Sequence, residues 1–351
     1  MKIFLFSFVC YAKTPTFVVL KFIERMEFNF KTILEFNDYF KDEKTCYEFL
    51  EKTLWDNVPV CPHCGVVKKP YKVKARGKFQ DIPSYRCSDR DCDLPFTVRT
   101  GSVFEGSKVE LRKWLQAVYE LSISNKGISS IELGKRIGVS QKTAWFINHR
   151  LRVMLTETLP HKLEGTIEID ETFVGGKNKN RHIGKKVADA SDKTPVLGLV
   201  QRGGNLKTFV IPDREKETIL PIMLANTEPK TNVITDGYTA YNDLSLTHYH
   251  TSVKHGEGDY KYITVGLDHT NNIEGVWSIL KRGILGTFHS VSRQHLQKYC
   301  NEFTFRYNHR KVTPIDRFYR GIKNSRQERI RYKALTSSKQ INKNPALETQ
   351  G

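Results

Sequence analysis

Three acidic residues lie where strands and a helix are expected to end or begin. Asp170 follows the alternating segment 166–169, Asp236 follows the short apolar segment 233–235, and Glu274 lies near the start of a helical pattern. Such carboxylates can converge at one edge of a sheet, where their hard oxygen atoms suit Mg²⁺. Taken singly, each is equally consistent with a strand-ending turn, a solvated strand end or a favourable helix N-terminus. The residues alone therefore leave both interpretations open.

If the three carboxylates do converge, the chemistry they support is phosphoryl transfer. Two bound ions would contact the attacking and the leaving oxygen of an in-line displacement. Lys281 follows Glu274 by seven residues, which is two helical turns along the same face, so we expect it to contact a DNA phosphate.

Four cysteines form two close pairs, Cys61 with Cys64 and Cys87 with Cys92. Paired cysteines on separate turns are typical ligands of a tetrahedral zinc ion. His63 is a competing ligand within the first pair. Four cysteine ligands leave no open coordination position, so the predicted Zn²⁺ is structural. The other three of the seven cysteines are isolated in the sequence, which indicates a reduced compartment.

A helix-turn-helix is predicted after the cysteine region. Leu133 and Ile137 mark a first helix, Gly138 makes the turn, and Ser140 caps a second helix. The polar residues at the start of the second helix suit the major groove of DNA. The alternative is an ordinary helical hairpin. The second helix carries Gln141, Lys142, Thr143, Arg150 and Arg152.

The remaining pattern predicts the fold class, an α+β multi-domain chain. Residues 30–55 predict one or two helices. After Gly165 the apolar period indicates a strand, a hairpin around 203–204, a helix, a short strand and further helices. This order is expected of a mixed α/β domain of the ribonuclease-H-like type.

Composition indicates a polyanionic partner. Lys and Arg number 56 against 38 Asp and Glu, a net charge of +18 over 351 residues, and binding to phosphates is driven by counterion release. No apolar run has membrane-spanning length, so we expect no membrane partner. Basic residues crowd the C-terminal stretch, where DNA contact and a solvated helix face remain alternatives: Arg306, Arg310, Lys311, Arg317, Arg320, Lys323, Arg326, Arg329 and Arg331.

The N-terminus imitates a short signal peptide, because Lys2 precedes the apolar run 3–9. We favour another interpretation, in which residues 1–25 are a non-native or disordered extension and Met26 is the true start. The expected regions are this extension (1–25), N-terminal helices (26–58), a zinc ribbon (59–104), the helix-turn-helix (108–158), the ribonuclease-H-like domain (163–312) and a basic tail (313–351).

Residues 30–310 resemble the zinc-ribbon DDE insertion-sequence transposases, which are related to Merlin elements and have an ISXO-type catalytic domain. The segments that carry the resemblance are 61–64, 96–102, 126–130, 141–145, 169–176, 235–238 and 269–283. The second cysteine pair is wider than the family's two-residue spacing, and residues 1–25 match nothing.

The resemblance implies catalytic roles and cofactors. The family's first two Asp map onto Asp170 and Asp236. Its third ligand is Glu or Asn followed by Lys two turns later, so Glu274 with Lys281 fits and Asn271 competes. The implied cofactors are catalytic Mg²⁺ or Mn²⁺ and structural Zn²⁺. The implied partner is double-stranded DNA, bound by a homo-oligomer in the cytoplasm or at the nucleoid.

The leading hypothesis is a transposase that cuts at the ends of its element and joins the freed 3′-OH to target DNA. The first alternative is a non-catalytic zinc and helix-turn-helix regulator derived from a transposase. The second is a structure-selective nuclease with the same fold, which would not need an end-binding module.

Overall fold

A computed structural model describes residues 30–66, 69–74, 82–157, 159, 161–175, 193–253, 269–326 and 330–337. These residues fall into two compact units, one ending at Lys41 and the other beginning at Asp42. The extension expected over residues 1–25 and Arg329 of the basic C-terminal stretch lie outside the described residues. No helix of the described ranges has the length and apolar character needed to cross a membrane.

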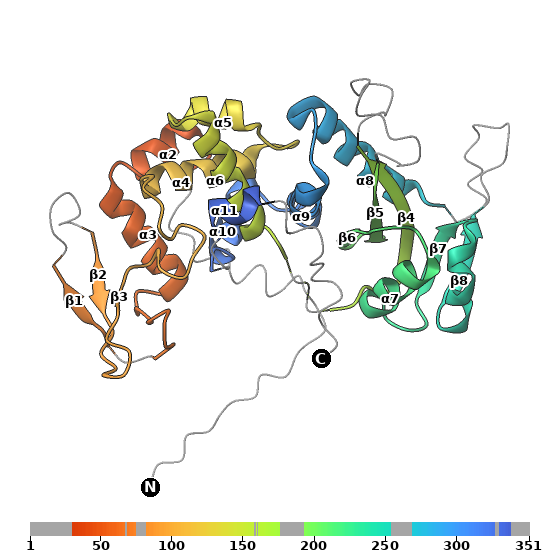
Figure 1. Ribbon diagram of the computed structural model, residues 1–351, viewed down its shortest axis with the longest axis horizontal. Helices are drawn as coiled ribbons and strands as arrows, with labels where there is room; N and C mark the ends of the chain where they lie inside the picture. Colours follow the sequence, from red (N-terminus) through yellow and green to blue (C-terminus); the bar gives the residue numbers. More distant parts are fainter. Residues whose placement is uncertain are drawn as a thin grey trace, which may run out of the picture. The chain divides into compact units, whose positions relative to one another are not determined.

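The elements alternate between helical and sheet regions along the chain (Figure 1). The first part contains α2 (Ile33–Tyr39), α3 (Glu43–Trp55), β1 (Tyr71–Val73), β2 (Ser84–Arg86), β3 (Pro95–Phe96), α4 (Leu111–Ile123), α5 (Ser130–Ile137) and α6 (Gln141–Met154). The second part contains β4 (Thr166–Val174), β5 (Thr194–Gln201), β6 (Leu206–Val210), α7 (Lys216–Asn226), β7 (Asn232–Asp236), the 3₁₀ helix η4 (Thr239–Leu246), β8 (Tyr249–Val253), α8 (Asn271–Gly283), the π-helix η5 (Ile284–Phe288), α9 (Arg293–Asn308), α10 (Pro314–Lys323) and α11 (Tyr332–Thr336).

Side-chain caps define where α2 and α3 begin. The Thr32 hydroxyl accepts the Glu35 N–H at the start of α2, and the Asp42 carboxylate accepts the Thr45 N–H at the start of α3. These caps satisfy amide groups that have no partner within the helix. Helix α3 stops at Asp56, which adopts the left-handed conformation at φ 49°. The helices predicted over residues 30–55 are therefore confirmed as two.

The cysteine region folds as a small antiparallel sheet in the order β1-β2-β3. Its strands have only two or three residues. The buried rings of Trp55, Tyr85 and Phe96 pack together, with centroids 5.6–5.9 Å apart. So small an apolar core cannot be the main source of stability, and a domain of this size usually needs a metal or a disulfide.

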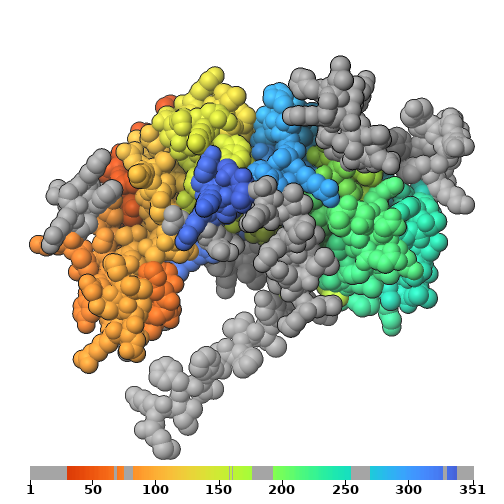
Figure 2. Space-filling model, viewed as in Figure 1, coloured from red at the N-terminus to blue at the C-terminus, as the bar shows by residue number. Residues whose placement is uncertain are grey.

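The helical region combines segments that are far apart in the sequence. Ser129 caps α5, Gly138 ends it at φ 63°, and Ser140 caps α6. Helix α10, the first part of the predicted basic tail, has a capping box at Thr313 and packs against α3 and α4 through the fully buried Phe318. In Figure 2 the blue surface of the C-terminal helices adjoins the yellow surface of the helical region.

Five strands form the larger sheet in the order β6-β5-β4-β7-β8. Strands β4, β5 and β6 are antiparallel neighbours, whereas β7 and β8 run parallel to β4. The hairpin predicted around 203–204 connects β5 to β6. Strand β8 was not predicted, because its sequence Tyr-His-Thr-Ser-Val alternates weakly and it lies at the edge of the sheet.

Each face of this sheet carries its own core. On one face, side chains of α7 and η4 pack against Ile167 and Ile169 of β4. On the other, side chains of α8 and α9 pack against Val174 of β4 and Val196 of β5. Alternate residues of β4 therefore point towards different helices, as the strand period of two requires. This alternation decides which carboxylates of β4 face α8.

Candidate catalytic centre and zinc site

Asp170 and Asp236 meet at the same edge of the larger sheet. Strands β4 and β7 are parallel, and Glu168 lies opposite Ile234. Because the register continues along both strands, Asp170 lies beside Asp236, two residues further on. Oxygen atoms of Asp170, Glu171 and Asp236 all lie within 4.8 Å of one another. The structure thus brings two of the three predicted carboxylates together and adds a third from the adjacent position.

Asp170 is held from above by helix α8. Trp277 Nε1 donates a hydrogen bond of 2.9 Å to Asp170 Oδ2. The indole has room because Asp170 pairs with Gly198 on β5, where an added Cβ would lie 2.5 Å from the Trp277 ring. Burial raises the pKa of Asp170, and the negative charges of Asp236 and Glu274 raise it further. The carboxylate is therefore oriented by α8 in a setting that favours a compensating cation.

Glu171 approaches the same point from the opposite face of β4. Its Oε1 accepts a 2.6 Å hydrogen bond from the Tyr241 hydroxyl of η4. Burial is the main reason that its pKa rises to about 7, and the Asp170 and Asp236 charges add to the effect. Glu171 was not among the carboxylates predicted from the sequence. Adjacent strand residues normally point apart, and only the end of the sheet lets both carboxylates reach one place.

The loop after β7 orients Asp236. Its Oδ1 accepts the Tyr238 N–H at 3.0 Å. Its backbone carbonyl accepts hydrogen bonds from the hydroxyls of Thr235 and Ser252. These contacts fix the position of Asp236 beside Asp170.

The predicted candidates for a third ligand, Glu274 and Asn271, both lie on α8. Glu274 is half-buried and influences the pKa of Asp170, but its oxygens are not among the carboxylate atoms within 4.8 Å of one another. Asn271 and Lys281 are exposed. On a helical wheel Glu274 lies between Trp277 and Ser278 and in line with Lys281, so it borders the face that contacts Asp170.

A second buried carboxylate, Glu168, lies two residues before Asp170 and is inaccessible to solvent. It accepts hydrogen bonds from the backbone N–H groups of Asn272 and Ile273 and from the Arg202 guanidinium. Sequence analysis treated it only as part of an alternating strand. Glu168 could have been recognised as unusual because it is a charged residue on the face of β4 that packs against α8.

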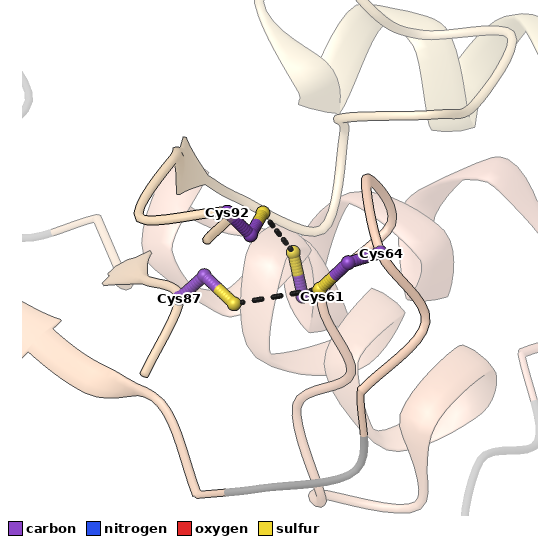
Figure 3. Close-up of side chains that lie close together, drawn as sticks. All are labelled: Cys61, Cys64, Cys87 and Cys92. Atoms are coloured by element: carbon purple, nitrogen blue, oxygen red, sulfur yellow. Dashed lines mark hydrogen bonds between the residues drawn. The ribbon is translucent and has the colours of Figure 1, made fainter. Parts of the chain in front are cut away.

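The four paired cysteines converge in the small domain, with all four sulfurs pointing towards one another (Figure 3). Cys61 and Cys92 sulfurs are 3.8 Å apart, and Cys64 and Cys87 sulfurs are 3.5 Å apart. A tetrahedral Zn²⁺ with bonds of about 2.3 Å places its sulfur ligands about 3.8 Å apart. The donor set and the spacing both fit zinc, including the wider second pair. His63 is exposed and is not part of the group.

The neighbouring thiols affect the protonation of Cys87. The Asp89 backbone N–H donates to the Cys87 sulfur and lowers the pKa of that thiol, but burial and the neighbouring thiols outweigh it and bring the pKa to about 12. A divalent ion that binds the four sulfurs displaces the thiol protons and compensates the negative charges of the thiolates.

The predicted DNA-reading residues of α6 divide into two groups. Gln141 and Lys142 are exposed at the start of the helix. Arg150 and Arg152 are 1% and 2% exposed, so they do not belong to the exposed start of the helix that is expected to face DNA. Arg150 packs over the Trp114 ring, and Arg152 pairs with Glu302 at 2.6 Å.

The basic C-terminal stretch also separates by environment. Arg306 is buried and pairs with Glu302. Arg310 and Lys311 donate to the carbonyls of the turn between β5 and β6. Arg317 and Arg320 are half-buried, whereas Lys323, Arg326 and Arg331 are exposed.

Comparisons with known proteins agree with this division of the chain. Residues 41–92 match the family described as a transposase zinc-ribbon domain, and residues 162–308 match the family described as an ISXO2-like transposase domain. A Haemophilus influenzae protein described as an uncharacterized transposase-like protein is 26% identical over 106 residues, which cover 30% of this chain and 82% of that protein.

A longer relative spans both regions. A Halobacterium salinarum protein, described as an uncharacterized protein in transposable element ISH50, is 32% identical over 281 residues, which cover 76% of this chain and 91% of that protein. A carboxylate cluster within the ISXO2-like region and a four-cysteine cluster within the zinc-ribbon region accompany this similarity. The chain therefore belongs to the insertion-sequence transposases that combine a zinc ribbon with an ISXO2-like DDE transposase domain.

Proposed function

We propose that the protein is a metal-dependent DNA transposase that cuts DNA at the ends of an insertion sequence and transfers the freed 3′-OH to target DNA. The observation that carries this proposal is the convergence of Asp170, Glu171 and Asp236 within 4.8 Å at one edge of the sheet. Like charges so close together are costly without a cation or solvent to compensate them. They lie inside the region that matches the transposase domain.

The strand order supports a ribonuclease-H-like interpretation of this domain. Counted from β4, the five strands have the spatial order third, second, first, fourth, fifth, with the first three antiparallel. The order of strands and helices along the chain is the one expected of such a domain. Such a sheet places the ends of its first and fourth strands side by side, where Asp170 and Asp236 lie.

The carboxylates fit Mg²⁺ or Mn²⁺ as hard oxygen donors. We assign Asp170 and Asp236 as ligands and Glu274 as the third ligand, with Asn271 as its competitor. When bound, such ions activate the attacking oxygen and stabilise the leaving oxygen of the phosphodiester. Trp277 and the Tyr238 N–H orient the two Asp side chains, and Lys281 would hold a neighbouring phosphate.

DNA recognition is assigned to the zinc ribbon and the helix-turn-helix pair α5 and α6. The cysteine cluster binds a structural Zn²⁺, since four thiolates complete its coordination. Ser140 caps α6 and leaves Gln141 and Lys142 exposed at its first turn, the part of a recognition helix that reads base edges. The net charge of +18 suits phosphate contact by these regions. A homo-oligomer would hold the two ends together.

The experiment uses the full chain with duplex DNA carrying the element's ends. Wild type is expected to nick these ends in Mg²⁺ or Mn²⁺ and to join them to a second duplex. Asp170→Asn and Asp236→Asn should abolish both products while DNA binding persists. The matched control is Asp243→Asn, because Asp243 of η4 pairs with Lys216 and takes no part in the cluster.

Other outcomes would replace the proposal. End-specific binding without cleavage in either metal would indicate the non-catalytic regulator. Cleavage of branched or unrelated DNA, without preference for the ends, would indicate a structure-selective nuclease. Normal cleavage by Asp170→Asn would place the active centre elsewhere.

A further inference from the structure

Glu168 is a buried charge that the proposed metal chemistry does not use. It lies on β4 two residues before Asp170, so both side chains point to the face covered by α8. Its side chain is inaccessible to solvent. A buried carboxylate is tolerated only where hydrogen bonds and an opposite charge compensate it. The hydrogen-bond partners of Glu168 therefore indicate the role of its negative charge.

Three of the partners belong to the first turn of α8. Glu168 Oε2 accepts the backbone N–H groups of Asn272 at 2.8 Å and Ile273 at 3.0 Å. Glu168 Oε1 accepts the Asn272 side-chain amide at 2.7 Å. Thr270, the residue at the N-cap position, makes no side-chain cap hydrogen bond. Glu168 therefore takes the place of a local cap.

Arg202 supplies the opposite charge. Arg202 Nε donates to Glu168 Oε1 at 2.7 Å, and the same guanidinium donates to the His269 carbonyl at 2.7 Å. His269 Nδ1 lies 3.5 Å from the carboxylate. The end of β5 and the residues just before α8 are thus tied to the same carboxylate.

Helix α8 is consequently attached to β4 at two points. Glu168 holds its first turn, and Asp170 accepts the Trp277 N–H one turn later. Glu274 lies between these two attachments. A cap supplied by Thr270 would belong to the same segment as α8 and would not fix the helix to the sheet. A cap supplied by Glu168 of β4 fixes the start of α8 relative to the strand that carries Asp170.

We infer that Glu168 is a positioning residue that clamps the start of α8 to β4 and thereby sets Glu274 against Asp170 and Asp236. This inference rests on the proposed function, because it assigns Glu274 to the metal site. It predicts that loss of the clamp weakens metal binding without any loss of a ligand. Residues that orient metal ligands typically contribute about 10- to 100-fold to metal affinity.

The test compares Glu168→Gln with wild type in the full chain. Hydrogen exchange of residues 271–274 should become faster, since Gln cannot accept the two amides as a charged group. Mn²⁺ affinity, measured by calorimetry, should fall by about 10- to 100-fold. The Mn²⁺ concentration needed for cleavage should rise in proportion, and affinity for DNA should not change.

Two controls separate positioning from other effects. Glu274→Gln should weaken Mn²⁺ binding while the amides of 272 and 273 remain protected. Glu164→Gln removes an exposed carboxylate just before β4 and should match wild type in every measurement. If Glu168→Gln does not fold, Asn272→Ala removes one of the hydrogen bonds and leaves the pair with Arg202. It should weaken Mn²⁺ binding severalfold.

The inference is overturned if folded Glu168→Gln, or Asn272→Ala in its place, binds Mn²⁺ as wild type does. It is also overturned if exchange at residues 271–274 is unchanged. Failure of the proposed function looks different, because wild type itself would then neither bind Mn²⁺ at this centre nor cleave DNA.

Discussion

Trp277 Nε1 and Asp170 Oδ2 are joined by a hydrogen bond of 2.9 Å, which connects α8 to β4 directly above Gly198. Two of the three elements that carry the proposed ligands, β4 and α8, are therefore joined by a donor that is itself fixed by packing. An oriented carboxylate loses less freedom when it binds a cation. This bond gives the first prediction.

Trp277→Phe keeps most of the ring and removes the donor. Cleavage in limiting Mg²⁺ should fall about tenfold, and the fold should lose about 2 kcal/mol, as expected for a hydrogen bond to a charged group. Single-turnover cleavage and urea unfolding measure the two effects. The control is Trp55→Phe, because Trp55 Nε1 has no hydrogen-bond partner among the described residues. Equal cleavage by both variants would contradict the role of the bond.

Substitutions on α8 and β4 can identify the third metal ligand. Glu274→Gln should abolish cleavage, whereas Asn271→Ala should retain most of it because Asn271 is exposed. Glu171→Gln should reduce cleavage without abolishing it, since its carboxylate is already held by Tyr241. Product yields of the three purified variants show which substitution reduces cleavage most. Loss in Asn271→Ala with normal Glu274→Gln would assign Asn271 as the ligand.

The zinc site predicts one Zn²⁺ per chain. Cys64→Ser should abolish zinc binding and expose the small sheet, because its aromatic core is too small to hold the fold alone. Cys300→Ala should retain the zinc, since Cys300 is buried in the core of the catalytic region. Metal analysis and near-ultraviolet circular dichroism follow the two properties. A folded small domain without zinc would refute the structural role.

The exposed start of α6 is expected to read bases. Lys142→Ala should weaken binding to the element's ends more than binding to random DNA. A uniform loss on all DNA would instead identify a phosphate contact. Competition binding at several salt concentrations measures both quantities. Lys44→Ala, on the exposed surface of α3, controls for the loss of one positive charge.

A buried ion pair predicts a pH dependence of stability. Burial alone would raise the pKa of Glu302, but the guanidinium groups of Arg306 and Arg152 hold it below its ordinary value of 4.5. The carboxylate therefore stabilises the fold above pH 4.5, and this contribution is lost as the pH falls through the lowered folded-state pKa.

Glu302→Gln should accordingly destabilise the protein by about 3–5 kcal/mol at pH 7. The difference from wild type should shrink as the pH falls below 4.5. Urea unfolding between pH 3 and pH 7 measures the curve. Glu48→Gln, exposed on α3 beside Lys44, should follow wild type. A difference that stayed constant down to pH 3 would mean that the charge of Glu302 is not the source.

Much of the fold was predictable because the signals are local. The cap at Ser140, the left-handed Gly138 and the hairpin at Gly203 each depend on a few neighbouring residues. Strand β8 and the packing of α10 were not predictable in the same way. The apolar alternation of β8 is weak. Helix α10 is basic, and it packs against α3 and α4, which lie far away in the chain.

For the site, the sequence alone determined which residue types were available: paired cysteines at ligand spacing, and acids at the ends of apolar segments. Only the tertiary structure decided which of them meet. It added Glu171 to the carboxylates of Asp170 and Asp236, and it buried Arg152 in an ion pair. The physical reason is that strand register and helix docking place side chains from distant segments, whereas sequence patterns report only the period and the boundaries of each element.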